Sequence, residues 1–343
     1  MGSHDKTNDS VVPSDRGIFT ISLDFELYWG VRDKRTIEEY GANIIGARSA
    51  IPKILELFVE FNVHATWAAV GFLFFTNRNE LKKSLPNLFP EYTRSALSPY
   101  PIVFQEQGDH ATIPDPYLFA PDLIDTICAY PGQEIGTHTF SHYYCLEKGQ
   151  TVAQFQADLN HAASITRKKC GYQPRSLVFP RNQWNSHYLH LLPKAGIHCF
   201  RGNELSWIYQ ASEDEGQGYM QRALRLLDTY FNISGYNTYN LPDCRNSVPN
   251  NFPASRFLRP YSRKLAFLDS LRLKRITSSM NDAAIRQRLF HLWWHPHNFG
   301  INTEKNLDFL RKILLHFKTL QQRHDMMSLN MGELSSLSVS HPE

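Results

Sequence analysis

The sequence GIFTISL, residues Gly17 to Leu23, leads directly into Asp24-Phe25-Glu26. An apolar run of this length, bounded by polar residues, predicts a strand that is buried on both faces, as strands of parallel sheets are. The two carboxylates stand two residues apart, so they lie on one side of the chain if the strand continues. This stretch therefore predicts a buried parallel sheet with acidic groups at the carboxyl end of one strand.

Apolar runs of this kind alternate with helical patterns along most of the chain. Further strands are predicted at 63–67, 134–138, 176–179, 197–200 and 289–294, and helices at about 43–61, 123–130, 152–170, 187–195 and 304–322. Strands that alternate with helices of this length pair in parallel through right-handed crossovers. The pattern predicts an α/β protein, either a barrel or an open parallel sheet.

The length of 343 residues fits two domains or one barrel with insertions, and no linker divides the chain. We expect a single domain over residues 17–330, after a tag-like or disordered leader at 1–16 and before a flexible tail at 331–343. Two stretches interrupt the alternation, 87–119 and 235–262, both rich in Pro and aromatic residues. They are expected to be insertions, either rims over a site or tolerated surface loops.

Composition excludes several classes of protein. A hydrophobic content of 42% excludes intrinsic disorder for the bulk of the chain. A net charge of +3 gives no support for binding nucleic acid or an anionic membrane, and no apolar run is long enough for a transmembrane segment. The sequence indicates no oligomeric state.

The 5 cysteines are scattered without a CxxC pair, which indicates a reducing compartment, and we expect a cytoplasmic protein. The opening Met-Gly-Ser-His resembles an engineered leader. The possibility that it has replaced a natural leader therefore stays open.

The most informative local pattern is a histidine pair, His138 and His142, that follows a predicted strand. Histidines four residues apart share a face if a helical turn follows, and imidazole nitrogens suit zinc. Chance pairs are expected among 15 histidines, but the end of a barrel strand is where α/β barrels hold catalytic groups. Asp24 and Glu26 could divide two tasks, metal ligation and proton acceptance, or could be ordinary acids at a strand end.

Two other strand ends carry candidate side chains. His295 follows Trp293-Trp294 and precedes a proline, so it could be a proton donor or a core histidine bonded to a carbonyl. Arg181 could orient a carboxylate through paired hydrogen bonds or be a plain surface residue. The residues after it, Asn182, Gln183 and Trp184, could line a sugar site, with the indole as a stacking face.

Taken in order, these motifs resemble the polysaccharide deacetylase superfamily, also known as the NodB-homology or family-four carbohydrate esterases. The resemblance covers most of residues 17–329. It rests on the acidic motif after the first strand, His-x-x-x-His after the third, Pro180-Arg181 after the fourth and His295 after the last strand. The resemblance implies a distorted parallel (β/α) barrel that hydrolyses an N-acyl group with the help of a metal.

The resemblance also implies a role for each matching residue. Asp24 would be the general base, His295 the general acid, and Arg181 the partner of the base. Zinc, or another divalent transition metal, would be held by Glu26, His138 and His142. Two departures stand out, because the usual adjacent acids are here Asp24-Phe25-Glu26 and the usual Arg-x-Pro order is reversed. The first departure leaves open which of the two acids touches the metal.

The expected substrate is an N-acetylated or N-formylated amino sugar, a unit or precursor of a surface polysaccharide. Tyr28 and Trp29 could stack on its rings or belong to the core. Two alternatives are a metal-independent amidohydrolase acting on a ureide or other linear amide, and a non-catalytic carbohydrate-binding barrel.

Overall fold

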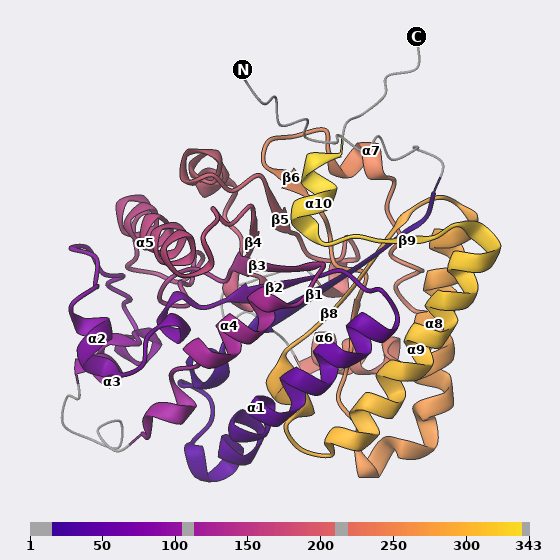
Figure 1. Cartoon of the computed structure of the whole chain (residues 1–343), viewed down its shortest axis with the longest axis horizontal. Helices are drawn as coiled ribbons and strands as arrows, with labels where there is room; N and C mark the ends of the chain where they lie inside the picture. The colour runs from indigo at the N-terminus through magenta and orange to yellow at the C-terminus, as the bar shows by residue number, and fades with distance from the viewer. Residues whose placement is uncertain (1–15, 105–112, 210–218, 338–343) are drawn as a thin grey trace, which may run out of the picture.

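A computed structural model describes residues 16–104, 113–209 and 219–337 of the chain. Its centre is a nine-stranded sheet in the order β6-β5-β4-β3-β2-β1-β8-β7, with β9 also paired to β1, and every pairing is parallel (Figure 1). The strands are β1 (Ile18–Phe25), β2 (Ala65–Ala69), β3 (Gln133–Thr137), β4 (Ser176–Val178), β5 (Cys199–Arg201), β6 (Asn250–Asn251), β7 (Arg256–Phe257), β8 (Leu289–Trp294) and β9 (Met327–Ser328).

Helices connect the strands and cover the sheet. They are α1 (Ile37–Glu60), α2 (Arg78–Lys82), α3 (Tyr100–Phe104), α4 (Pro121–Ala129), α5 (Val152–Cys170), α6 (Tyr219–Asp228), α7 (Leu241–Cys244), α8 (Asp269–Ile285), α9 (Thr303–His324) and α10 (Met331–Ser336). In the described ranges, none of these helices has both the length and the apolarity of a membrane-spanning segment.

The predicted parallel α/β architecture is confirmed. Strand β1 lies in the middle of the sheet, where Leu23 is opposite Trp67 of β2 on one side and Trp294 of β8 on the other. Among the described residues the edge strands β6 and β7 do not pair with each other, so the sheet is an open, curled half-barrel. Because all strands run the same way, the residues that follow them meet at one edge of the sheet.

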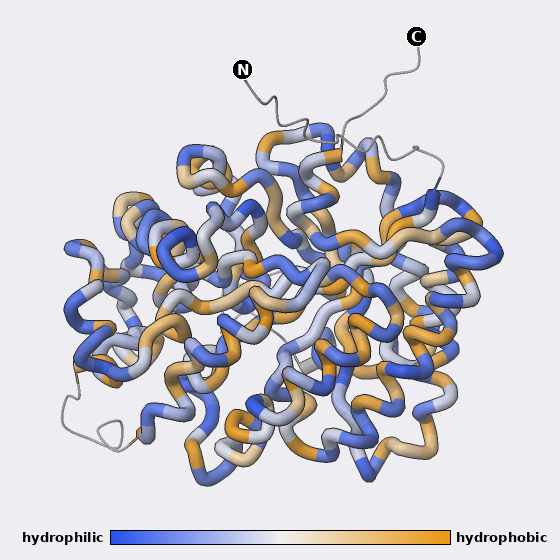
Figure 2. Tube along the Cα trace, viewed as in Figure 1, coloured by the Kyte–Doolittle hydropathy of each residue, from blue (hydrophilic) through white to orange (hydrophobic). Residues whose placement is uncertain are grey.

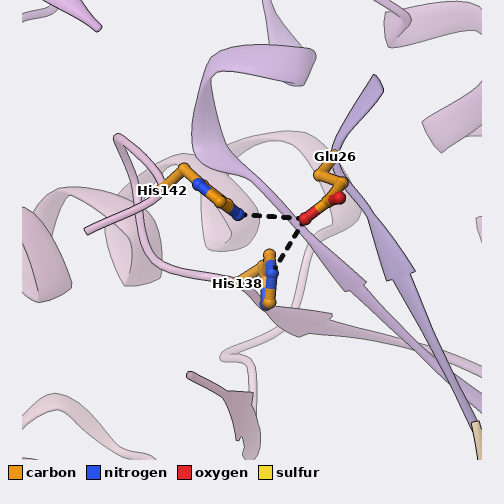
Figure 3. Close-up of side chains that lie close together, drawn as sticks. All are labelled: Glu26, His138 and His142. Carbon is orange, nitrogen blue, oxygen red and sulfur yellow. Dashed lines mark hydrogen bonds and ion pairs between the residues drawn. The ribbon is translucent and has the colours of Figure 1, made fainter. Parts of the chain in front are cut away.

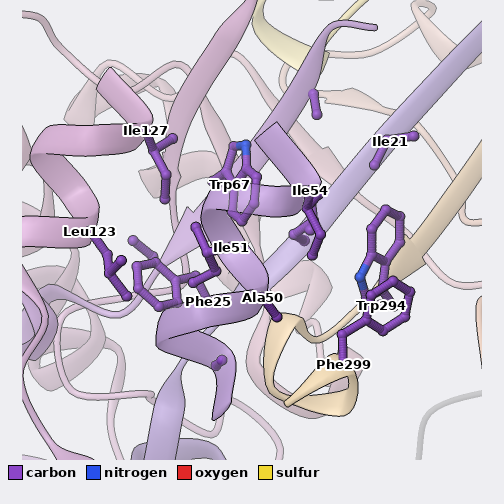
Figure 4. Close-up of a cluster of buried hydrophobic side chains, with 14 of the residues drawn as sticks. Ile21, Phe25, Ala50, Ile51, Ile54, Trp67, Leu123, Ile127, Trp294 and Phe299 are labelled. Carbon is purple, nitrogen blue, oxygen red and sulfur yellow. The ribbon is translucent and has the colours of Figure 1, made fainter. Parts of the chain in front are cut away.

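The main core lies between the sheet and helices α1, α4 and α9. In α1, Ile51 and Ile54 are fully buried and lie near the indoles of Trp67 and Trp294 (Figure 4). Burying a side chain of this size contributes about 1.5–3 kcal/mol. Figure 2 shows that the long outer helices alternate between hydrophobic and hydrophilic segments, as helices with one face on a core do.

The structure corrects three expectations about the connections. The stretch 235–262 is more than an inserted loop, because it carries β6 and β7, the two edges of the sheet. Residues 331–336 form α10, whose Met331 and Leu334 are buried, rather than a flexible tail. The predicted helix at 187–195 is two 3-10 helices that end at Gly196, where φ is 78°.

Residues 105–112 of the stretch 87–119 lie outside the described ranges, and the described part of the stretch contains two 3-10 helices and α3. The expected leader, apart from Arg16, and the last residues of the expected tail lie outside them as well.

Candidate active site

Three candidate ligands converge at the carboxyl edge of the sheet (Figure 3). Glu26 Oε2 lies 2.9 Å from His142 Nε2 and 3.2 Å from His138 Nε2. All three side chains are buried, with at most 4% of each residue exposed. Glu26 follows β1, and the two histidines follow β3, the strand beyond β2 in the sheet.

The loop that carries the histidine pair is held by a carboxylate from α5. Asp158 accepts hydrogen bonds from the backbone N–H groups of Phe140 (2.7 Å) and Ser141 (3.1 Å) and from the Ser141 hydroxyl. Within this loop Thr139 and His142 adopt φ values of 65° and 58°, which are unfavourable for residues with a side chain. The Asp158 contacts offset that cost, so Asp158 helps to place His142 opposite Glu26.

The ring nitrogens of His138 are arranged as a metal ligand requires. His138 Nδ1 lies 2.7 Å from the carbonyl oxygen of Val178, to which it can only donate, so Nε2 carries the lone pair. This Nε2 is buried and makes no hydrogen bond. Burial lowers the pKa of His142 to about 3, so its ring is neutral, and its Nδ1 lies 3.2 Å from both the Tyr144 hydroxyl and Arg32 Nη1.

These residues fit a divalent transition metal. One ligand atom from each of Glu26, His138 and His142 lies within 4.8 Å of the others. Within the described ranges, no other group of three His, Cys, Asp or Glu residues is placed to hold a metal ion. Two imidazoles and a carboxylate suit zinc, which in catalytic sites takes three protein ligands and keeps one position open. Burial alone would raise the pKa of Glu26, but His295, His138 and His142 hold it well below its ordinary value, so the carboxylate is ionised.

Asp24 is held by a different partner from the one expected. Arg201, which ends β5, donates to both carboxylate oxygens, at 2.7 Å to Oδ1 and 2.8 Å to Oδ2. Burial would raise the pKa of Asp24, but the Arg201 guanidinium outweighs it and the pKa lies below its ordinary value. Arg201 also donates to Ser22 Oγ and Asn182 Oδ1, at 2.9 Å each, and its guanidinium lies 4.2 Å from the Trp293 ring.

His295 approaches both carboxylates from β8. Its Nε2 lies 3.5 Å from Glu26 Oε1 and 3.7 Å from Asp24 Oδ2, and its side chain is 25% exposed. The ring stacks on His297 at 5.0 Å and meets the edge of Trp293 at 5.6 Å. It is the most exposed of these groups, so a substrate can reach it.

The expected pairing of Arg181 with the base is wrong in this structure. Arg181, where φ is 57°, forms an ion pair with Asp33 and lies 4.2 Å from the Tyr144 ring. Arg201 takes its place. The sequence signal for this role is Arg201 itself, a charged residue directly after the predicted strand 197–200 and at the same edge of the sheet as Asp24.

The proposed sugar-contacting residues are mostly inside the protein. Trp29 is fully buried and donates to the carbonyl oxygen of Leu118, so of its two alternatives, stacking on a sugar or belonging to the core, the structure favours the core. Gln183 is 2% exposed and bonds Glu147, and Trp184 packs on Phe200. Tyr28 lines an open cleft although only 4% of it is exposed, and Asn182 lines a small cavity beside Arg201.

Comparison with known proteins agrees with the resemblance inferred from the motifs. Residues 41–200 match the model of the polysaccharide deacetylase family. A Mycobacterium smegmatis protein assigned to the polysaccharide deacetylases superposes with a TM-score of 0.57 at 13% identity, over 97% of this chain and 96% of that one. A Pseudomonas aeruginosa PAO1 protein of the same assignment gives 0.53 at 11% identity, over 94% and 91%.

No curated protein matches the sequence significantly. The structural likeness confirms the fold, and the family match supports a deacetylase hydrolase that acts on C–N bonds.

Proposed function

Because residues 41–200 relate this chain to the polysaccharide deacetylases, we propose that it is a metal-dependent hydrolase that removes an acetyl or formyl group from an amino sugar. One observation carries the proposal: the Glu26–His138–His142 group lies beside an Asp24 that Arg201 keeps ionised. A binding protein needs neither a buried base nor three converging ligands. The substrate is proposed to be a unit or precursor of a surface polysaccharide.

Glu26, His138 and His142 would hold the metal, and zinc is the ion we propose. Such an ion supplies Lewis-acid chemistry, which makes an acyl carbonyl carbon more open to attack by water. The roles of the two acids follow from their neighbours. Glu26 Oε2 faces both imidazole nitrogens, whereas both oxygens of Asp24 are occupied by Arg201.

Asp24 is the group that takes a proton from the attacking water. It is ionised at neutral pH, and each oxygen keeps a second lone pair beyond its bond to Arg201. The pair of Arg201 bonds fixes the carboxylate in one plane, so the base needs no reorientation.

His295 is the group that gives a proton to the leaving amine. The nitrogen of a sugar amine is a poor leaving group unless it is protonated as the C–N bond breaks. His295 Nε2 lies within 3.7 Å of an oxygen of each carboxylate and its side chain is 25% exposed, so a substrate nitrogen can approach both His295 and Asp24.

The test is release of acetate or formate from a panel of N-acyl amino sugars by protein loaded with zinc. Activity that is lost with a chelator, restored by zinc and absent in Asp24→Asn is the expected result. Turnover of a ureide or linear amide without metal would contradict the proposal and favour the metal-independent alternative. Sugar binding without release of an acid would favour the non-catalytic alternative.

A further inference from the structure

A small arginine-lined cavity shares a wall with the candidate active site. Its volume is about 200 Å³, below the range of about 300–1,000 Å³ of whole-ligand pockets, so it has room for one substituent. Asn182 and Trp293 line it, and both also contact Arg201, the residue that binds Asp24. A substrate whose acyl group lies at Asp24 can therefore extend a neighbouring group into the cavity.

Around the cavity, the carboxylates that the structure describes are fewer than the arginines. Arg256 and Arg275 share one carboxylate, that of Asp228, which pairs with Arg256 and lies 3.2 Å from Arg275. Arg259 donates through Nε to Thr229 Oγ1 at 2.8 Å, and it has no carboxylate partner among the residues that the structure describes. Arg259 is partly buried, and burial lowers the pKa of its guanidinium.

Several buried polar atoms in the lining make no hydrogen bond, among them Arg256 Nε and Glu204 Oε1. Arg256 is 5% exposed and its Nε makes no hydrogen bond, and Glu204 is 4% exposed with an unpaired Oε1. Burial raises the pKa of Glu204, which favours its protonated form, and a protonated carboxyl can donate a hydrogen bond. Unpaired buried polar groups are costly, and a ligand with acceptor oxygens would satisfy both.

We propose that this cavity binds an anionic group of the substrate, a phosphate or a carboxylate, through Arg259 and Arg256. The inference rests on the proposed function and narrows it: the substrate is an N-acyl amino sugar that carries a negative charge near the acylated nitrogen. Arginine suits either anion, because its planar fork pairs with two oxygens at once.

The first experiment compares kcat/KM for three substrates: N-acetylglucosamine, its 1-phosphate, and N-acetylmuramic acid, which carries a carboxylate. We expect one anionic sugar to be preferred over the neutral one, and the preferred one identifies the anion. In Arg259→Gln this preference should fall about tenfold or more, the usual effect of losing a charged hydrogen bond. Arg259→Lys should keep part of it, and Arg222→Gln, on the exposed face of α6, should keep all of it.

The second experiment measures binding of inorganic phosphate by calorimetry and needs no turnover. His138→Ala separates the cavity from the metal site, to which phosphate could also bind. Binding that persists in His138→Ala and is lost in Arg259→Gln supports the proposal even if no sugar is deacetylated. Binding that persists in Arg259→Gln, or equal kcat/KM for neutral and anionic sugars, overturns it.

Discussion

At the scale of single residues, the candidate base belongs to a chain of buried hydrogen bonds. Arg201 donates to Ser22 Oγ as well as to Asp24, and Ser22 Oγ lies 2.8 Å from His291 Nε2. Burial lowers the pKa of His291 to about 3, so its ring is neutral and its Nδ1 can donate to the carbonyl oxygen of Phe252, 3.1 Å away. Each member has a partner, which fixes Arg201 and, through it, the plane of the Asp24 carboxylate.

The two carboxylates at the site should respond differently to loss of charge. Asp24→Asn should abolish turnover, because an amide cannot accept the proton of water, yet leave about one zinc per chain. Glu26→Gln should lose zinc first, and excess metal should restore part of the activity. Metal analysis and acid-release assays on both variants check this, and the reverse pattern would exchange the two roles.

His295 should matter most when the leaving group is poor. His295→Ala is expected to lower kcat on an N-acetyl amino sugar by about 10²–10⁴-fold, the usual range for a general acid. The aryloxide of an aryl acetate ester leaves without a proton, so kcat on that ester should be far less affected. Equal losses on both substrates would instead indicate that His295 only packs against Trp293 and His297.

At the scale of helices and strands, sequence periodicity located the elements better than it located the side chains. The predicted bounds of α5 and β8 agree with the structure, because α5 has a capping box at Thr151 and β8 ends before Pro296. Edge strands β6 and β7 have two residues each, too few for any period to be read. The pairing of Arg201 with Asp24 depends on which strands face each other across the curled sheet, and no local pattern contains that.

The loop after β3 depends on α5 through Asp158. Asp158→Ala removes the acceptor for two backbone N–H groups, and the left-handed turn at His142 should lose its support. We expect metal affinity to fall by about 10–100-fold, as for other residues that orient ligands, with a smaller loss of stability. Zinc titration measures the affinity. Asn160→Ala, on the exposed face of the same helix, is the control, and an equal effect in both variants would contradict a positioning role.

The ends of α4 and α5 bring two cysteines together. Cys128 Sγ and Cys170 Sγ are 3.1 Å apart, and both residues are partly exposed. Treatment with a disulfide-forming oxidant should therefore join them, with a mass loss of two hydrogens. Tm should rise, because the link lowers the conformational entropy of the unfolded chain. Cys128→Ser should prevent both changes. Modification of the two thiols without a link would contradict the geometry.

At the scale of the whole molecule, parallel topology explains why residues far apart in sequence form one site. Asp24 and Glu26, the histidine pair, Arg201 and His295 all follow or end strands, and parallel strands present these ends at one edge. The second half of the sheet needs its own support, because β7 is an edge strand of two residues. Asp228 at the end of α6 provides it by pairing with Arg256 of β7 and Arg275 of α8.

This cluster should make stability depend on pH in acid. Burial would raise the pKa of Asp228, but Arg256 and its other partners lower it from 3.8 to about 2. A carboxyl whose pKa is lowered on folding stabilises the fold above its unfolded pKa. That contribution, about 2 kcal/mol, is lost as pH falls from about 4 through 2.

Asp228→Asn should therefore cost about 3–5 kcal/mol at pH 7, because it leaves two buried guanidinium groups without their carboxylate. The difference from wild type should then narrow by about 2 kcal/mol between pH 5 and pH 2, since only the wild type loses the charge. Urea unfolding at each pH measures both quantities. Asp243→Asn, at an exposed position, should show neither effect, and a pH-independent difference for Asp228→Asn would mean that folding does not lower the pKa of Asp228.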